Sequence, residues 1–251
     1  MNYHWNWNIF WETSPDGVST YMNTLLLGAQ WTLATALSAW VIALLLGALI
    51  GTIRTLPNRP ILVGFANAYV ELFRNIPLLV QMFLWYFVIP EILPKVVGEW
   101  IKGQSNAPFI TAVLCLAFFT SSRVAVNTTA GIQSLPRGQK MAGTALGLTQ
   151  AQTYRYILLP MAGRILLPPL TSEFLNIIKN SSVALTIGVL ELMSAARSMQ
   201  EFSFQVFEAF SAATIIYVVI NLVVLVLMRW LEKLLAVPGF IGSNSSQAGG
   251  H

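Results

Sequence analysis

Five charged residues lie inside segments that are otherwise apolar, and their types suit either ion pairing or ligand binding. They are Glu71, Arg74, Arg123, Glu173 and Lys179. A charge at the centre of a lipid bilayer costs at least about 2.5 to 3.5 kcal/mol on insertion scales, so such residues usually pair or line a wet cavity. Two roles therefore stay open for them, as structural ion pairs between helices or as contacts along a substrate path.

An amino acid would find complementary groups among these five residues. Its ammonium group calls for a carboxylate such as Glu71 or Glu173, and its carboxylate calls for an arginine, whose planar guanidinium can form two hydrogen bonds. An acidic amino acid has a second carboxylate and would need a further cation or a helix N-terminus. The candidate cations are Arg74, Arg123 and Lys179, although Lys179 could equally extend toward the outer interface.

The positions of these charges predict which of them could meet. Glu71 and Arg74 are three residues apart on one helix face, so they could pair within a helix. Arg123 and Glu173 fall near the middle of two different apolar segments and could pair between helices.

The sequence offers little else for catalysis or metal binding. Cys115 is the only cysteine, so neither an intrachain disulfide nor a cysteine zinc site is possible, while His4 and His251 lie far apart in the chain. The phosphate-loop pattern G-x-x-x-x-G-K-[ST] is missing from the sequence. We therefore expect no catalytic residue, metal or cofactor in this chain, and an energy source in another chain or in an ion gradient.

The composition places these charges in a membrane protein. Of the 251 residues, 55% are hydrophobic and 10% are charged, whereas soluble domains have about 25% charged residues. No basic region precedes the first apolar run, which argues against a cleavable secretory signal. We expect the chain to contact membrane lipid and no nucleic acid.

Five segments are long and apolar enough to cross a bilayer as helices, for which about 20 residues are needed. They cover residues 25–53, 61–90, 108–133, 165–190 and 209–228. We predict an all-α integral membrane protein with one transmembrane domain over 25–233. Residues 1–24 form an aromatic N-terminal segment and residues 234–251 a flexible tail.

The distribution of Lys and Arg predicts the orientation, because cytoplasmic loops collect positive charge. One side of the membrane receives eight of these cations: Arg54, Arg59, Arg137, Lys140, Arg155, Arg164, Arg229 and Lys233. The other side receives three: Lys95, Lys102 and Arg197. We therefore predict that the N-terminus is outside, the C-terminus is cytoplasmic and the number of spans is odd.

Three local patterns carry further expectations. The aromatic stretch MNYHWNWNIFW suits either a membrane interface or an arm packed on its own protein. Pro168 and Pro169 should weaken the fourth span, giving a hinge, a ligand-lining break or a rigid kink. Gly47 and Gly51 form G-x-x-x-G and predict a close helix contact without a role in transport.

The polar stretch KMAGTALGLTQAQTYRYILLP lies in the long connection over residues 134–164. Helix formers precede Gly147, which suits the left-handed position that ends a helix. Thr149 and Gln152 fit a capping box, so a second helix should begin there and run toward Pro160. Such a hairpin buries little apolar surface alone, so it either rests on the membrane or fills a groove in a partner.

This stretch resembles the coupling loop of bacterial ABC importer permeases, in which E-A-A is followed by a glycine and later by I-x-L-P. The residues at the signature positions are Met141, Ala142, Gly143, Gly147, Ile157, Leu159 and Pro160. Met141 and Gly143 depart from the pattern, and the acidic side chain of the signature is missing here.

Other stretches resemble the polar amino acid subfamily of these permeases, most of all its glutamate and aspartate members. They are YVELFRNIPLLVQ at 69–81, SLPRGQK at 134–140, YRYILLP at 154–160 and PPLTSEFLNIIKNSS at 168–182. With the WNWNIF start, the resemblance extends to about Pro238. It makes 1–24 periplasmic, 25–233 the permease domain, 134–164 the cytoplasmic coupling loop and 234–251 a cytoplasmic tail.

The resemblance implies a multi-pass permease subunit in the bacterial inner membrane. A periplasmic binding protein delivers the amino acid, a second permease subunit that is homologous but different completes the path, and two ATPase subunits bind ATP and Mg²⁺. In this family the loop helix docks in a groove on the ATPase. The residues alone leave an ion-gradient-driven transporter or channel as the alternative, although no inverted repeat is evident, and a membrane enzyme as a third.

Overall fold

The computed structural model describes residues 3–235, and over this range the regular elements are helices, with no β-strand. Three of them are long and apolar enough to cross a membrane: α1 (Tyr21–Ile53), α6 (Ala107–Gln133) and α11 (Val206–Leu235). Two bent pairs of helices raise the number to five if each pair counts as one span. The all-α prediction is confirmed, whereas the number of spans and the orientation stay predictions.

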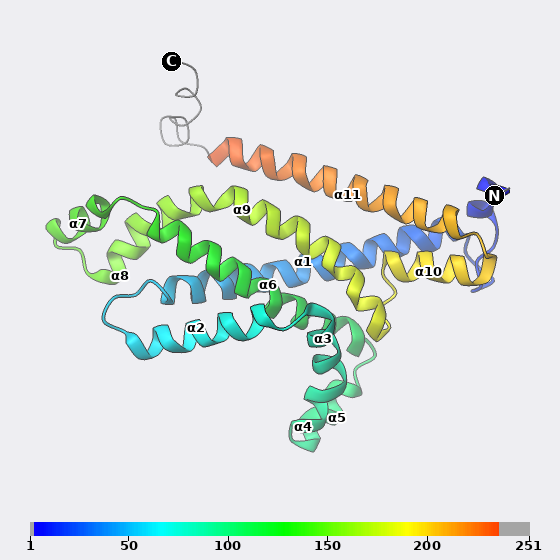
Figure 1. Cartoon of the computed structure of the whole chain (residues 1–251), viewed down its shortest axis with the longest axis horizontal. Coiled ribbons are helices and arrows are strands. Elements are labelled where there is room, and N and C mark those ends of the chain that lie inside the picture. Colours follow the sequence, from blue (N-terminus) through cyan, green and yellow to red (C-terminus); the bar gives the residue numbers. More distant parts are fainter. Residues whose placement is uncertain (1–2, 236–251) are drawn as a thin grey trace, which may run out of the picture.

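The long helices lie along one axis (Figure 1). One end of the bundle, which we call the hairpin end, carries α7 (Arg137–Ala145) and α8 (Gln150–Thr153). The opposite end, which we call the arm end, carries the N-terminal segment with its 3₁₀ turn at Trp7–Trp11 and α10 (Leu192–Ser203). The predicted tail beyond residue 235 lies outside the described residues.

Helices α1 and α6 pack closely because two glycines let their backbones approach. A Cβ on Gly47 would lie 2.6 Å from the Val124 side chain, and a Cβ on Gly51 would lie 2.6 Å from the carbonyl oxygen of Ala125. Real Cβ atoms do not approach so closely, so any larger residue would push the helices apart. The packing role predicted for this glycine pair is confirmed.

The second apolar segment is broken in the middle. Helix α2 (Pro60–Asn75) meets the helical run Leu78–Ile92 at 103°. Ile76 between them is extended, as expected for a residue that precedes a proline. The Gln81 Nε2 donates to the carbonyl oxygens of Phe73 and Ile76, at 2.8 and 2.9 Å, and so satisfies acceptors at the break.

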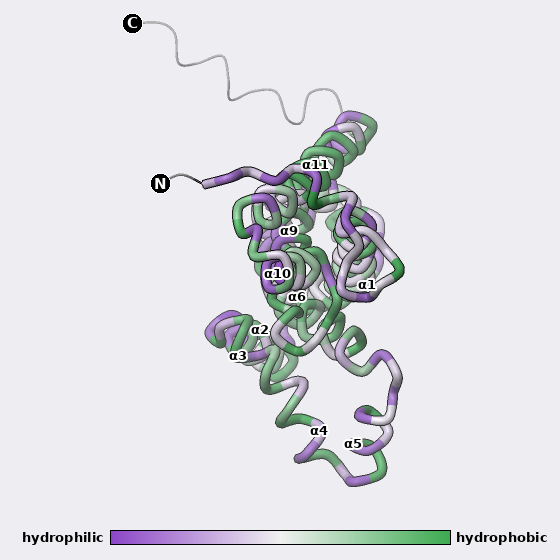
Figure 2. Tube along the Cα trace, turned by 90° about the vertical axis from the view of Figure 1, so that its right-hand side faces the viewer, coloured by the Kyte–Doolittle hydropathy of each residue, from purple (hydrophilic) through white to green (hydrophobic). Residues whose placement is uncertain are grey.

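The chain after this break turns away from the axis of the bundle. It forms α3 (Leu78–Phe83), a π-helical turn (Leu84–Val88), α4 (Ile89–Ile92) and α5 (Lys95–Lys102). Figure 2, a view along the bundle axis, shows α4 and α5 projecting from one side and α11 at the opposite margin. Residues 61–90 are therefore an angled pair of helices and not one straight rod.

The fourth apolar segment belongs to a longer helix than the sequence indicates. From α8 the chain continues through a π-helical turn (Tyr154–Leu158) into α9 (Leu159–Asn180) and a 3₁₀ turn (Ser181–Ile187). Pro160 does not end it, because proline is tolerated where the ladder of hydrogen bonds is already shifted by the π turn. Pro168 and Pro169 also lie within α9 without a break in the helix.

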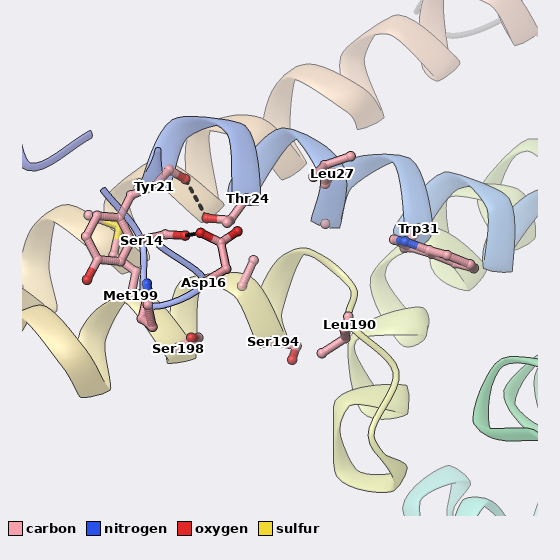
Figure 3. Close-up of a pocket in the computed structure, with 13 residues that line it drawn as sticks. Ser14, Asp16, Tyr21, Thr24, Leu27, Trp31, Leu190, Ser194, Ser198 and Met199 are labelled. Atoms are coloured by element: carbon pink, nitrogen blue, oxygen red, sulfur yellow. Dashed lines mark hydrogen bonds between the residues drawn. The ribbon is translucent and has the colours of Figure 1, made fainter. Parts of the chain in front are cut away.

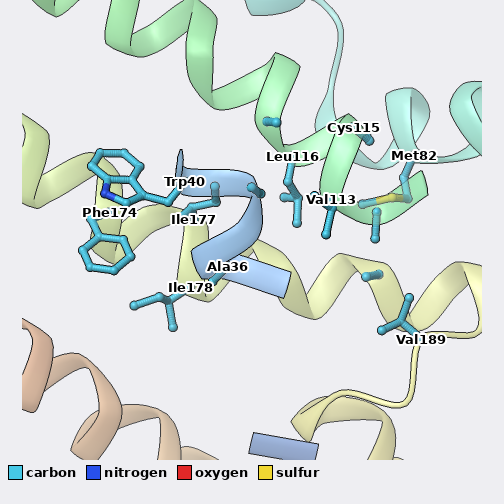
Figure 4. Close-up of a cluster of buried hydrophobic side chains, with 14 of the residues drawn as sticks. Ala36, Trp40, Met82, Val113, Cys115, Leu116, Phe174, Ile177, Ile178 and Val189 are labelled. Atoms are coloured by element: carbon cyan, nitrogen blue, oxygen red, sulfur yellow. The ribbon is translucent and has the colours of Figure 1, made fainter. Parts of the chain in front are cut away.

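The main core lies where α1, α6 and α9 meet (Figure 4). Trp40 of α1 stacks on Phe174 of α9, with ring centroids 5.0 Å apart. Met82 of α3 and Leu116 of α6 are fully buried in the same cluster, as is the single cysteine, Cys115. This core holds α6 and α9 side by side, which sets the positions of the charges they carry.

Candidate functional site

Arg123 of α6 and Glu173 of α9 form a two-point ion pair inside the bundle. The Arg123 Nε lies 2.7 Å from Glu173 Oε2, and a terminal guanidinium nitrogen lies 3.2 Å from Oε1. The Glu173 side chain is 10% exposed and the Arg123 side chain 43%. The predicted interhelical pair is confirmed as a contact, while its role in transport stays a prediction.

This arrangement leaves the pair open on one side. A guanidinium has five N–H donors, and two of them are used by the Glu173 carboxylate. The rest of the half-exposed Arg123 group can donate to a second carboxylate without first releasing Glu173. Such a geometry suits the recognition of an acidic or zwitterionic solute as well as helix packing.

Glu71 and Arg74 do not form the intrahelical pair that their spacing allows. The Glu71 carboxylate instead accepts a hydrogen bond from the Asn75 side chain, at 3.1 Å, and both charged residues are exposed on α2. Arg74 lies in the last turn of α2, where the helix dipole favours a cation. Asn75, four residues after Glu71 on the same face, takes the Glu71 carboxylate in place of Arg74.

Lys179 is exposed in the last turn of α9, again where the helix dipole favours a cation. Among the five predicted charges, the contacts within residues 3–235 join Arg123 to Glu173 and no other pair. Glu71, Arg74 and Lys179 therefore lie apart from this pair, and their contribution to a substrate path stays a prediction.

A buried carboxylate that sequence reasoning missed lies at the arm end. Glu191 is fully buried and accepts hydrogen bonds from the amides of Met193, at 2.9 Å, and Ser194, at 2.8 Å, which caps α10. The Tyr217 hydroxyl of α11 donates to it at 2.9 Å, and Thr32 of α1 at 3.4 Å. Glu191 thus ties three helices together, and the only sequence signal is its position just before an amphipathic helix.

The aromatic N-terminal segment packs on its own protein. Glu208 of α11 accepts hydrogen bonds from the Asn6 amide, at 2.8 Å, and from the Tyr3 hydroxyl. Ile9 and Phe10 are buried against α1 and α10. Three tryptophans nevertheless remain exposed, Trp5, Trp7 and Trp11, so a role at a membrane interface stays a prediction alongside the packed arm.

A pocket of about 330 Å³ opens at the arm end between α1 and α10 (Figure 3). Asp16 at its rim accepts hydrogen bonds from the hydroxyls of Ser19 and Ser14 and from the amides of Ser19 and Val18. These bonds hold the pKa of the Asp16 carboxyl well below its usual range. The Asp16 carboxylate oxygens accept these bonds from the turn over residues 14–19. Asp16 is therefore fixed in the wall of the pocket.

Gly147 ends α7 in the predicted way. It has a positive φ of 72°, and the Leu148 amide donates to the Gly143 carbonyl at 3.0 Å. The Gly147 amide donates to the Thr144 carbonyl, also at 3.0 Å, which completes a Schellman motif. Because glycine adopts this backbone conformation without steric cost, Gly147 fixes the bend between α7 and α8.

The second arm of the hairpin begins with the predicted capping box. The Thr149 hydroxyl accepts from the Gln152 amide, and the Gln152 side chain accepts from the Thr149 amide at 2.8 Å. Gly143 lets the two arms touch, since a Cβ there would lie 2.9 Å from the Thr153 side chain. This packing gives a physical reason for glycine at a position where the family pattern has alanine.

Tyr154 anchors the hairpin to the bundle. It is buried against Leu158 and Ile132, and its hydroxyl donates to the Thr55 carbonyl at 2.8 Å in the connection between α1 and α2. The hairpin is therefore fixed to the end of α1 as well as to α9.

The outer side of the hairpin exposes apolar residues. Met141 is 70% and Leu146 76% exposed, and Ala142 on the same helix is also exposed. Of the other signature residues, Leu159 and Pro160 are exposed, while Ile157 is half-buried next to Gly143. Large exposed apolar side chains on a polar hairpin suit contact with a partner or with the membrane surface, the two alternatives that the sequence leaves open.

Within residues 3–235, no group of three His, Cys, Asp or Glu side chains is close enough to hold a metal ion. Among the residues predicted from the sequence, the described part of the chain offers two candidate sites, the Arg123–Glu173 pair and the exposed face of the hairpin.

Residues 43–237 match the family model described as binding-protein-dependent transport system inner membrane component. The chain is 45% identical over 245 residues to the glutamate/aspartate import permease protein GltJ of Escherichia coli K12, covering 96% of this chain and 99% of the relative. It is 30% identical over 228 residues to the glutamine transport system permease protein GlnP of the same strain, covering 91% of this chain and 96% of the relative.

Two solved structures have the same fold. A crystal structure of an amino acid ABC transporter with histidines superposes with a TM-score of 0.72 at 31% identity, covering 85% of this chain and 95% of the other. The inward-facing MetNI methionine ABC transporter gives a TM-score of 0.71 at 19% identity, covering 86% of this chain and 98% of the other. Each superposition covers at least 85% of this chain.

Proposed function

Because the chain belongs to the family of binding-protein-dependent transport system inner membrane components, we propose that it is the permease subunit of an ATP-driven importer for glutamate and aspartate. The observation that carries this proposal is the 45% identity to a glutamate/aspartate permease over 96% of the chain. The relatives are permease subunits, which are membrane components and not enzymes themselves, and this chain is a component of the same kind. They give no support to an ion-gradient-driven transporter.

In the proposed topology the chain crosses the bacterial inner membrane five times. Each bent pair then counts as one span, the arm end faces the periplasm and the hairpin end faces the cytoplasm. The distribution of Lys and Arg supports this orientation, and so does the exposed apolar face of the hairpin, which needs a partner on its side of the membrane.

The proposed assembly contains this chain, a second homologous permease, two ATPase subunits and a periplasmic amino-acid-binding protein. ATP and Mg²⁺ bind the ATPase subunits, and this chain contributes the docking hairpin. Met141, Ala142 and Leu146 would enter a groove on the ATPase, while Gly147 and Tyr154 hold the hairpin in position.

Arg123 is the proposed contact for a substrate carboxylate. It is half-exposed, it retains free donors, and Glu173 fixes its orientation. Glu173 also offers a carboxylate for the substrate ammonium, whereas Glu71, Arg74 and Lys179 would contribute at other positions along the path.

The proposal is tested by co-purifying the chain with its partners and measuring uptake of labelled glutamate into vesicles. We expect recovery of a second permease and an ATPase, and uptake that requires the binding protein and ATP. Labelled aspartate should compete with glutamate, and glutamine should compete less. ATP-dependent uptake of neutral amino acids alone would contradict the acidic substrate and leave the importer assignment intact.

A further inference from the structure

A second cavity, of about 370 Å³, lies between the beginning of α9 and the end of α11. Its lining residues come from both helices: Arg164, Leu167, Pro168, Arg229, Glu232, Lys233 and Leu235. The pocket is at the hairpin end, since α9 follows the hairpin and α11 runs back from the arm end (Figure 1). It is separate from the Arg123–Glu173 pair and from the exposed face of the hairpin.

The charges around this pocket do not balance. Arg229 and Lys233 are four residues apart on one face of α11, and Arg164 faces them from α9. The one carboxylate in the lining, Glu232, accepts a hydrogen bond from the Thr171 hydroxyl of α9 at 2.8 Å. Within the described chain, none of these three cations takes part in an ion pair, so the pocket attracts an anion.

The surface beside the pocket is apolar. Leu222 and Val226 of α11 are exposed and precede Arg229 by seven and three residues, so they share its face of the helix toward the membrane, and Trp230 is exposed next to Arg229. Trp230 suits the headgroup level of a bilayer, where tryptophan is enriched, and Leu222 and Val226 suit acyl chains. An anion with a long apolar part matches both surfaces, whereas a free phosphate would use only the pocket.

We propose that this pocket binds the headgroup of an anionic phospholipid, with the acyl chains lying along the outer face of α11. Basic pockets between membrane helices on the cytoplasmic side suit phosphate headgroups, and each Lys or Arg near the surface strengthens such binding by about 5-fold. The bound lipid connects the first turns of α9 to α11, which otherwise meet through the Thr171–Glu232 hydrogen bond at this level. The proposed orientation decides only which leaflet of the membrane supplies the lipid.

The test uses the full complex and counts bound lipids by native mass spectrometry during titration with phosphatidylglycerol or phosphatidylcholine. The pocket variant is Arg229→Gln with Lys233→Gln. The matched control is Arg59→Gln with Arg137→Gln, which removes two exposed cations expected on the same side of the membrane but outside the pocket. Helical circular dichroism and gel filtration check that both variants fold.

We expect the wild-type complex to retain phosphatidylglycerol in preference to phosphatidylcholine. The pocket variant should lose about 25-fold in affinity for phosphatidylglycerol, the product of two 5-fold effects, and the control should not change. Excess inorganic phosphate should not displace the lipid.

Three results would overturn the proposal. Equal losses in the pocket and control variants would indicate a general effect of charge, and displacement by inorganic phosphate would assign the pocket to a free anion. Absence of retained lipid in the wild-type complex would indicate that a companion subunit covers the pocket. Glutamate uptake enters none of these readouts, so failure of the proposed transport function would be seen separately.

Discussion

The hairpin of α7 and α8 and the Arg123–Glu173 pair are both polar interruptions of an apolar chain, but opposite kinds of contact hold them. In the hairpin the bonds that form the bend and the cap join groups within five residues, as in the bonds from Leu148 to Gly143 and from Gln152 to Thr149. The ion pair joins residues that are 50 positions apart on different helices.

This difference predicts which property, coupling or folding, a substitution in each region should impair. The hairpin satisfies itself locally and leaves apolar side chains free for a partner, so changes on its outer face should impair coupling while the fold remains. The ion pair is part of the contact between α6 and α9, so its loss should impair folding and transport together. Four substitutions can break or sharpen this contrast.

Arg123→Gln should have the largest effect. It leaves the Glu173 carboxylate, which is 10% exposed, without its charged partner. Breaking a fully buried pair costs about 3 to 5 kcal/mol, and we expect roughly 2 kcal/mol or more here because Arg123 is partly exposed. Thermal unfolding in detergent and glutamate uptake at matched membrane levels would measure the two losses.

The double variant Arg123→Met with Glu173→Leu is the control for Arg123→Gln. It removes both charges, so most of the lost stability should return. If Arg123 also contacts substrate, uptake should stay low despite this recovery. Full recovery of uptake would reduce the pair to a structural role.

Ala142→Asp should abolish coupling with little loss of stability. The side chain is exposed on α7, so the change should cost less than about 1 kcal/mol in folding while placing a charge on the docking face. ATPase activity stimulated by the binding protein should disappear in reconstituted complexes. Thr144→Asp adds the same charge on another side of α7 and should retain that activity.

Normal stimulated ATPase activity in the Ala142→Asp complex would contradict docking through this face. Gly147→Asp is a less direct probe, although it should also uncouple transport. Its positive φ strains any residue with a Cβ, so the variant disturbs the bend itself.

Thr149→Ala should have an intermediate effect confined to the hairpin. Loss of an N-cap hydroxyl costs about 1 kcal/mol of helix stability. Because Tyr154 still anchors the hairpin to Thr55, we expect faster amide hydrogen exchange near Gln150 to Thr153 and unchanged exchange in α9. Thr149→Ser should restore slow exchange, and faster exchange throughout α9 would show that the hairpin is not a local unit.

Glu71→Gln should have the smallest effect on stability. Its carboxylate is exposed and its recorded hydrogen bond, from Asn75, can be accepted equally well by an amide oxygen. Unfolding should shift by less than about 0.5 kcal/mol. A fall in glutamate uptake without such a shift would place Glu71 on the substrate path, and unchanged uptake would remove it.

The sequence predicts the features whose causes are local. Gly147 and the Thr149–Gln152 capping box determine the hairpin within a dozen residues. Gly47 and Gly51 mark the face of α1 that packs closely on α6. Pro77 is also a local signal, for the break between the two helices of 61–90. The hydropathy of this segment continues across Pro77, so hydropathy alone predicts a single span.

Among features with distant causes, the Arg123–Glu173 contact could be predicted, because both charges fall near the middle of apolar segments. The contacts of Glu191 could not be predicted, because only the folded chain brings Tyr217 and Thr32 to it. The pair that spacing allows within α2 does not form, and its spacing says nothing about competition from Asn75.

The uninterrupted helix that begins at Gln150 makes the hairpin and Glu173 parts of one rod. At 1.5 Å per residue, Ile157 and Glu173 are separated by about 24 Å along it. A tilt of about 10° at the hairpin would displace Glu173 by about 4 Å, which exceeds the reach of a hydrogen bond. The rod thus converts a rotation at one end into a displacement at the other, so a partner that tilts the hairpin by about 10° would separate Glu173 from Arg123.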